Sequence, residues 1–276
     1  MIKKIFLTTA ILSAVYLYQN KYVKKREHII NSPKIPKEFD NFKILQVSDI
    51  HCDRVGFSDQ VFIENIKKEK ADIIVITGDI LDSYKNDTDY AYNLLAQISE
   101  IAPSYFVSGN HELRLPEEYN KIKKVMADLG ITHLENQSEL IEKDGSRLNL
   151  VGIEDFNYFI KNDKDNYYAN HRNELLKNYK EDMFNILLAH RPEKFFIYSE
   201  IGYDLIFSGH AHGGQWDVPF VGRIFSPSQG FMPKYTHGIY QENSSKMVVS
   251  QGLGNSSFSI RLNNFLEYVV VELKSE

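Results

Sequence analysis

The 276-residue chain predicts an α/β fold built on a parallel sheet that is buried on both faces. Short, continuously apolar runs alternate with longer segments of helical periodicity, which is the pattern of βαβ units. The amino-acid composition changes after Gln215, where glycine, proline, serine and spaced aromatic residues precede two strand-like runs. This change predicts a second, largely antiparallel sheet that closes the fold.

The expected elements follow one another regularly from residue 43. Strands are expected at 43–49, 71–79, 104–110, 185–190, 203–210, 246–250 and 265–273, and helices at 58–70, 87–100, 117–129 and between 190 and 203. Residues 131–156 predict short strands and turns, with Asp144 and Gly145 as the turn of a hairpin. Residues 157–172 are polar and aromatic without clear periodicity, which favours a surface loop over a lid above a site.

The N-terminus has the charge pattern of a membrane anchor. Residues 1–26 hold six basic and no acidic side chains around an uncharged, mostly apolar run from Ile5 to Asn20. The run has the length of the hydrophobic region of a signal peptide, and no small-residue cleavage site follows it. We therefore expect a signal anchor or a single membrane-associated helix at 1–26, a linker at 27–41 and one domain at 42–276. Basic residues on both sides of the run leave the side of the membrane open.

The composition of the chain excludes several functional classes. Residues 27–276 carry 26 basic and 37 acidic side chains, which makes a poor surface for nucleic acid. An apolar fraction of 43% and a charged fraction of 25% exclude wholesale disorder and a polytopic membrane protein. The single cysteine, Cys52, excludes an internal disulfide and a cysteine-based zinc cluster.

Polar residues follow each of the buried strands. They are Asp49 and His51, Asp79, Asn110 and His111, His190, and His210 and His212. Since the carboxyl ends of strands in open α/β sheets meet at the ligand crevice, we expect these side chains to lie together. Left unpaired, each would cost roughly 1 to 3 kcal/mol, a cost that a metal centre removes. Carboxylate, amide and imidazole donors favour Mn, Fe or Zn over Ca or Mg.

The order DIH, GD, GNHE, a lone histidine after a strand and GHAH resembles the five-motif signature of the calcineurin-like metallophosphoesterases. The segments GHAHGGQ and GLGNSSFSIRLNN and the N-terminal anchor further resemble the membrane-associated bacterial branch with the YkuE-like and YaeI-like phosphodiesterases. The resemblance implies a four-layer α/β/β/α sandwich with two mixed β-sheets flanked by helices. It also implies one metal at Asp49, His51 and His212, a second at Asn110, His190 and His210, and Asp79 as the bridge between them.

The resemblance implies a membrane-anchored phosphoesterase with two divalent ions, Mn being favoured over Fe or Zn. In such enzymes a hydroxide bridging the metals attacks a phosphodiester, pyrophosphate or phosphomonoester. His111 is placed to protonate the leaving oxygen, and Glu112 to orient His111. Some relatives in this neighbourhood hydrolyse UDP-2,3-diacylglucosamine, so a lipid-linked substrate is the expectation, with no nucleic-acid partner. The alternative is a non-catalytic envelope protein that binds metal.

Two groups of residues near the motifs have no role fixed by the sequence. Arg54, Arg114, Arg191 and Arg223 are either phosphate contacts or solvated arginines. Trp216, Phe220, Phe225, Phe231 and Tyr235 either form an apolar rim for a lipid-like substrate or pack the second sheet. The second reading is favoured, because aromatic residues most commonly belong to the core.

Overall fold

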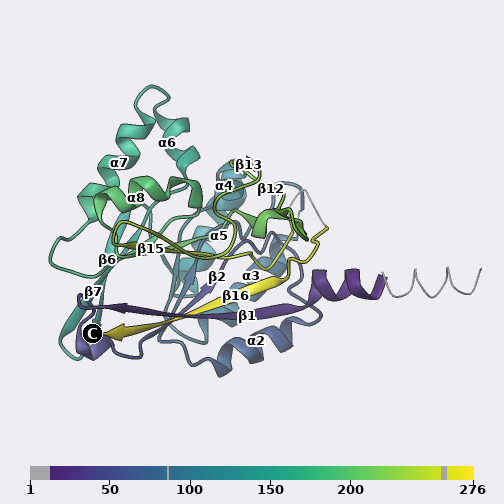
Figure 1. Cartoon of the computed structure of the whole chain (residues 1–276), viewed down its shortest axis with the longest axis horizontal. Helices are drawn as coiled ribbons and strands as arrows, with labels where there is room; N and C mark the ends of the chain where they lie inside the picture. The colour runs from purple at the N-terminus through teal and green to yellow at the C-terminus, as the bar shows by residue number, and fades with distance from the viewer. Residues whose placement is uncertain (1–12, 86, 256–259) are drawn as a thin grey trace, which may run out of the picture.

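Two six-stranded sheets face each other and helices cover their outer sides (Figure 1). The computed structural model describes residues 13–85, 87–255 and 260–276. The first sheet has the order β1 (Val23–Ser32), β16 (Leu266–Ser275), β2 (Lys43–Val47), β3 (Ile73–Ile76), β4 (Ser104–Phe106) and β5 (Thr132–His133). The second has the order β14 (Gly238–Glu242), β15 (Ser245–Val249), β9 (Leu205–Ser208), β8 (Asn185–Leu188), β7 (Ser146–Gly152) and β6 (Gln137–Lys143).

Both sheets are mixed. In the first, β2, β3, β4 and β5 run parallel, and β16 is antiparallel to β2 but parallel to β1. In the second, β7, β8, β9 and β15 run parallel, and the hairpin strands β6 and β14 are antiparallel to their neighbours. The hairpin between β6 and β7 turns at Asp144 and Gly145, as predicted, because both residues adopt the positive φ that a tight hairpin turn requires.

Three clusters of buried apolar side chains hold the four layers together. One lies between the sheets and joins Val75 and Val271 of the first sheet to Leu188 and Phe207 of the second. A second packs α2 (Asp59–Lys68), α3 (Thr88–Ser99) and α5 (Pro116–Asp128) on the outside of the first sheet. A third packs α6 (Phe156–Asn162), α7 (Tyr167–Asn178) and α8 (Phe195–Ile201) on the outside of the second. These contacts confirm the predicted α/β/β/α sandwich.

Residues 27–41, predicted to be a linker, belong to the folded body instead. Strand β1 pairs in parallel with β16 from Val23 and Leu266 to Ser32 and Ser275. After it, Ile35 and Phe39 are buried between the sheets, and Phe39 lies in the short 3-10 turn η1 (Lys37–Phe39). The strand was hard to recognise in the sequence because β1 lies at the edge of the sheet, and charged side chains are common on edge strands.

Two further expectations need correction. Residues 157–172 form most of the α6–α7 hairpin, which stands at the top of Figure 1, rather than a loop. The residues after Gln215 do not make a separate antiparallel sheet, because β16 joins the first sheet and β15 joins β9 in parallel. Only two small hairpins lie apart from the large sheets among the described residues, β10 (Asp217–Val218) with β11 (Gly222–Arg223), and β12 (Phe225–Ser226) with β13 (Gly230–Phe231).

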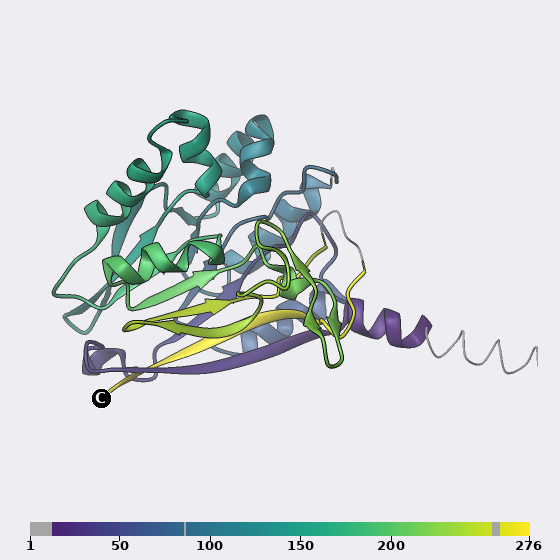
Figure 2. The same cartoon turned by 45° about the horizontal axis from the view of Figure 1, so that its top comes forward.

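The predicted anchor at 1–26 is described only in part, since residues 1–12 lie outside the described residues. Residues 13–21 are helical and lead directly into β1 (Figure 2). Within the described ranges, no helix combines the length and the apolar character that crossing a bilayer requires.

Candidate metal centre

The polar residues that follow the buried strands meet in one place. Asp49, Asp79 and Asn110 follow β2, β3 and β4 of the first sheet, and His190 and His210 follow β8 and β9 of the second. Each of the seven predicted ligands is at most 6% exposed; they are Asp49, His51, Asp79, Asn110, His190, His210 and His212. The gathering therefore lies where the carboxyl ends of both sheets come together.

One group of donors consists of Asp49, His51 and His212. His51 Nε2 lies 3.2 Å from His212 Nε2 and 3.8 Å from Asp49 Oδ1. His212 Nε2 lies 3.6 Å from the same carboxylate oxygen. Donor atoms bound to one ion at roughly 2.1 Å stand about this far apart, so the group fits a single divalent ion.

A second group consists of Asp79, His190 and His210. His190 Nε2 lies 3.1 Å from Asp79 Oδ2, and that same oxygen is 3.8 Å from His51 Nε2 of the first group. Asp79 thus stands between the two groups. Asn110 Oδ1 is buried without a hydrogen-bond partner among the described residues, and Asn110 and Asp79 line the same cavity of about 350 Å³. A cation beside Asn110 would satisfy that oxygen.

Neighbouring residues fix the imidazole orientations. His190 Nδ1 is 2.7 Å from the carbonyl oxygen of Thr77, so Nδ1 carries the proton in the neutral ring and Nε2 is left as a donor atom. His51 Nδ1 lies 3.2 Å from Asp82 Oδ2, which again directs Nε2 into the site. His210 Nε2 contacts Ser228 Oγ at 3.0 Å, which leaves Nδ1 for the site.

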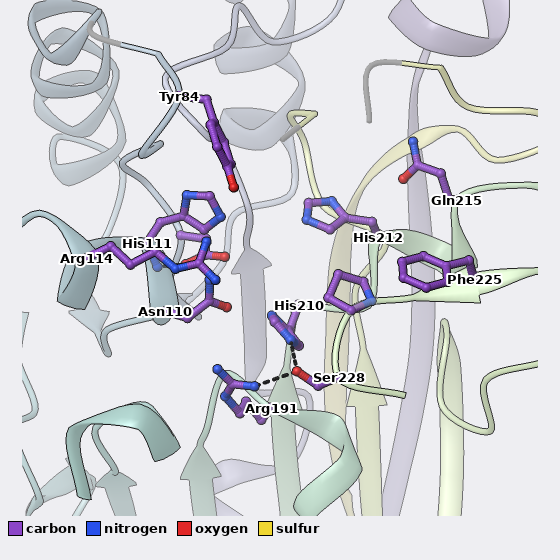
Figure 3. Close-up of a pocket in the computed structure, with 12 residues that line it drawn as sticks. Tyr84, Asn110, His111, Arg114, Arg191, His210, His212, Gln215, Phe225 and Ser228 are labelled. Atoms are coloured by element: carbon purple, nitrogen blue, oxygen red, sulfur yellow. Dashed lines mark hydrogen bonds between the residues drawn. The ribbon is translucent and has the colours of Figure 1, made fainter. Parts of the chain in front are cut away.

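Ser228 is held in turn by a buried arginine. Arg191 Nη1 donates to Ser228 Oγ at 2.6 Å (Figure 3). Arg191 Nε donates to Asp155 Oδ2 at 2.6 Å. Sequence analysis missed Asp82 and Ser228 as partners of the ligands. Asp82 had a signal, since it lies three residues after Asp79, but Ser228 comes from a distant segment that only the fold brings close.

The carboxylates of the site raise the pKa values of two histidines. Burial disfavours a charged imidazole, but Asp49, Asp82 and Asp79 outweigh it and raise the pKa of His51 to about 9. Asp79 and Asp49 likewise outweigh burial and raise the pKa of His190 to about 10. The site thus collects positive charge when no metal is bound, and divalent ions would displace these protons.

Burial prevails at the other two histidines. It lowers the pKa of His212 to about 3 and holds the pKa of His210 well below its ordinary value. Burial also opposes the charge of the carboxylates, but His212 and His190 outweigh it and lower the pKa values of Asp49 and Asp79, respectively. Anionic carboxylates and neutral imidazoles are the forms that bind metal.

The backbone of the site is strained at most of the predicted ligands. Positive φ values between 45° and 65° occur at five of the seven residues, namely Asp49, His51, Asp79, His210 and His212. Such φ values cost roughly 1 to 3 kcal/mol for residues with a side chain, and they concentrate at functional sites. Glycine is also required, because a Cβ on Gly109 would lie 2.2 Å from Asp79 Oδ1.

His111 lies on the short helix α4 (Asn110–Arg114) and faces the same cavity. Figure 3 shows Asn110 and His111 across the cavity from His210 and His212. His111 Nδ1 accepts from the backbone N–H of Ser83 at 3.0 Å, so Nε2 carries the proton in the neutral ring. Burial lowers the pKa of His111, which favours that neutral form.

Glu112 does not orient His111, contrary to the prediction. Its carboxylate instead accepts from the backbone N–H groups of Asp79, Leu81 and Gly109, at 2.9, 2.9 and 2.7 Å. Burial, reinforced by the charge of Asp79, raises the pKa of Glu112 to about 7. Glu112 therefore ties the loop after β3 to the loop after β4.

Some of the arginines and aromatic residues that the sequence left without a role line the cavity, and the others lie elsewhere. Arg114 and Arg191 line the cavity, whereas Arg223 donates to the carbonyl oxygen of Gly213 and Arg54 lines a groove elsewhere. Phe225 lines the cavity and also a neighbouring apolar hollow of about 180 Å³, which Trp216, Ile224 and Phe231 complete with Gln215. Tyr235 is buried, and Phe220 and Phe231 are strongly exposed.

Comparison with known proteins agrees with this geometry. The family model described as calcineurin-like phosphoesterase matches residues 42–214. The chain is a calcineurin-like phosphoesterase. The matched residues of this phosphoesterase include all seven of the predicted ligands and His111.

The phosphoesterase is similar to several curated bacterial proteins. The metallophosphoesterase YkuE of Bacillus subtilis is 32% identical over 92% of this chain and 86% of its own length. YkoQ of the same organism is 28% identical over 80% of this chain and 79% of its own. The phosphodiesterase YaeI of Escherichia coli is 28% identical over 84% of this chain and 82% of its own. These relatives support membership of the YkuE/YaeI-like branch.

Proposed function

We propose that this phosphoesterase is a membrane-associated, binuclear enzyme that hydrolyses a phosphodiester, pyrophosphate or phosphomonoester. One ion is held by Asp49, His51 and His212, the other by Asn110, His190 and His210, and Asp79 bridges them. Imidazole and oxygen donors without a thiolate suit manganese, iron and zinc, and manganese is the favoured metal because of the resemblance to the family.

The convergence of metal-donor atoms from both sheets carries the proposal. Imidazole nitrogens from both sheets approach carboxylate oxygens to between 3.1 and 3.8 Å inside a buried cavity. Without metal, protons on His51 and His190 balance part of the carboxylate charge, and divalent ions bound between the same atoms would displace them. Two divalent ions supply Lewis-acid activation of water and neutralise the charge of the phosphoryl oxygens.

The other residues of the cavity bind the substrate and move a proton. His111 keeps its Nε2–H free of the Ser83 contact, and in the imidazolium form it transfers that proton to the leaving oxygen and returns to the neutral ring. Arg114 lies on the rim and attracts the phosphoryl group by its charge. Arg191 is already engaged with Asp155 and Ser228, so its main task is to hold the His210 ring in place.

The finer part of the proposal is a lipid-linked substrate such as UDP-2,3-diacylglucosamine. The apolar hollow beside the cavity supports it, since the two share Gln215 and Phe225 and the hollow offers room for part of an apolar chain. The N-terminal segment 1–26 supplies the membrane tether in this proposal, with its apolar run between basic residues.

The test is hydrolysis of bis-p-nitrophenyl phosphate and p-nitrophenyl phosphate by the purified chain with added Mn. Asp79→Asn is expected to abolish turnover, because this carboxylate lies between both donor groups. Asp89→Asn, an exposed carboxylate on α3, is the matched control and retains activity. Undiminished turnover in the Asp79 variant would refute the assignment. Tight metal binding without hydrolysis over a broad phosphoester panel would favour the non-catalytic envelope protein.

A further inference from the structure

Large apolar side chains project into solvent from the two small hairpins that follow the metal centre. Phe220 and Val221 form the turn between β10 and β11, with relative exposures of 110% and 51%. Phe231 and Met232, at the end of β13, are 80% and 62% exposed. An apolar group of this size at neighbouring turns indicates a surface that binds something.

The backbone at these turns is unfavourable for the residues it carries. Phe220 has a φ of 67° and Met232 a φ of 54°, the left-handed region that bulky side chains avoid. Within one copy of the chain these two side chains gain no burial that offsets the strain. Strain combined with full exposure therefore points to contacts made outside the chain.

The hairpins are joined to the helix at 13–21 by hydrogen bonds. Asp217 at the start of β10 donates its N–H to Leu262 and accepts from Asn263 Nδ2 through its carbonyl. Asn263 in turn exchanges two hydrogen bonds with Gln19 on the helix, both of 3.2 Å. These bonds place the β10–β11 hairpin beside the helix (Figure 2).

The helix and the connecting segment extend the same apolar surface. The exposed residues here are Val15, Tyr16, Leu17 and Tyr18 on the helix and Ile260 and Leu262 on the segment. We call these six, with Phe220, Val221, Phe231 and Met232, the apolar face. The hydrogen bonds through Asn263 bring the helix next to the β10–β11 hairpin, and Phe231 of the β12–β13 hairpin lines the apolar hollow together with Trp216.

We propose that the apolar face docks on an anionic lipid bilayer, with the β10–β11 turn as a second membrane contact besides the N-terminal segment. The inference rests on the proposed membrane association. Residues 13–20, the described part of the uncharged run Ile5 to Asn20, lie on the helix of this face. Lys24 and Arg54 border the helix with exposed positive charge, whereas the rest of the body is acidic. Basic residues at the edge of an apolar, aromatic surface match a layer of anionic headgroups.

A groove next to the helix also combines apolar and basic side chains. It is lined by Leu17, Lys21 and Arg54 together with Phe57, whose side chain is 68% exposed. An aromatic ring and two cations side by side suit the boundary between acyl chains and headgroups. In this orientation the apolar hollow beside the metal centre lies near the lipid surface, since Phe231 belongs to both the hollow and the apolar face.

The test uses the full chain and vesicles of equal parts phosphatidylglycerol and phosphatidylethanolamine. Trp216, the only tryptophan of the sequence, stands at the base of the β10–β11 hairpin and reports on its surroundings by fluorescence. We expect a blue shift on vesicle binding and quenching by brominated lipids. Phe220→Ser with Val221→Ser should weaken vesicle binding by roughly tenfold or more and reduce the quenching.

The control is Leu176→Ser with Phe196→Ser, which removes two exposed apolar side chains, 44% and 42% exposed, from α7 and α8. Its vesicle affinity should equal that of the unmodified chain. Hydrolysis of p-nitrophenyl phosphate in each variant reports the folded metal centre separately, so a failure of the docking surface is distinguishable from a failure of the proposed function. The proposal would be overturned if the hairpin variant bound vesicles and was quenched like the unmodified chain. It would also be overturned if the unmodified chain were a dimer and only the hairpin variant were a monomer.

Discussion

At the scale of single residues, the structure gives His111 a defined hydrogen-bonding state. Its Nδ1 accepts from the Ser83 N–H, so the proton of the neutral ring points away from that contact on Nε2. The role predicted for it depends on the leaving group, because p-nitrophenolate departs readily without protonation and an alkoxide does not.

His111→Asn should therefore slow alkyl phosphodiesters by about a hundredfold or more and p-nitrophenyl esters much less. The measurement is kcat for both substrates in the variant and in the unmodified enzyme. Bound metal, counted in the same samples, should stay at the unmodified level. An equal loss with both substrates would mean that His111 acts by positioning the site rather than by donating a proton.

Glu154 is a residue whose charge is costly in the folded state. It is 3% exposed and accepts from Tyr119 Oη at 2.9 Å and from Ser108 Oγ. His133 Nε2 lies 3.9 Å away, but burial lowers the pKa of His133 to about 4, so this neighbour is neutral above that pH. Burial raises its pKa from 4.5 to about 6. Between these pH values the folded chain binds a proton that the unfolded chain has released, so this group lowers stability as pH rises.

Glu154→Gln removes that ionisation. Above pH 6, it should increase the free energy of unfolding by about 2 kcal/mol relative to the difference measured near pH 4. Urea unfolding of both proteins at several pH values measures this change. The control is Glu139→Gln on β6, a more exposed carboxylate. A constant difference between variant and unmodified chain across the pH range would contradict the assignment to Glu154.

The gathering of the seven predicted ligands could be anticipated because they belong to short motifs at strand ends. All seven predicted ligands lie together, and Gly109 before Asn110 approaches Asp79 too closely for a side chain. The residues that hold the predicted ligands in place were harder to predict from the sequence. Arg191 and Ser228 are 37 residues apart, and their contact is created by tertiary packing, which no local spacing records.

At the scale of elements, the buried strands were the most predictable parts and the edge of the first sheet the least. Strands β2, β3, β8 and β9 are mostly apolar and almost entirely buried because both faces of each are covered. Strand β1 shows one buried apolar side chain, Ile30, among charged and exposed residues. The α6–α7 hairpin was missed for a similar reason, since each of its helices buries only a narrow apolar stripe.

The integration of β1 can be tested with two neighbouring isoleucines. Ile30 is 1% exposed and packs between the sheets, whereas Ile29 is 63% exposed on the opposite side of the strand. Ile30→Ala should lower the free energy of unfolding by about 2 to 5 kcal/mol, and Ile29→Ala by about 0.5 kcal/mol or less. Chemical denaturation of both variants decides this. Equal, small effects would restore the interpretation of this segment as a linker.

At the scale of the whole molecule, the metal centre joins the two halves of the sandwich. Asp49, Asp79 and Asn110 come from loops of the first sheet, and His190, His210 and His212 from loops of the second. The backbone at this junction is strained, and a divalent ion bound between donors from both sheets would hold the loops together. Metal should therefore stabilise the fold as well as support catalysis.

Binding to the folded state alone stabilises a protein by an amount set by the metal concentration relative to Kd, about 2.7 kcal/mol at 100 times Kd. Adding Mn to the chelator-treated enzyme should raise Tm, and a chelator should reverse the change. In Asp79→Asn the increase should largely disappear, because both donor groups lose their shared carboxylate, whereas Asp89→Asn should respond like the unmodified enzyme. A metal-dependent increase that survives intact in the Asp79 variant would place the stabilising ion elsewhere. Since the donors of both sheets must come together to bind, the increase should appear as a shift of one cooperative transition rather than as a separate early phase.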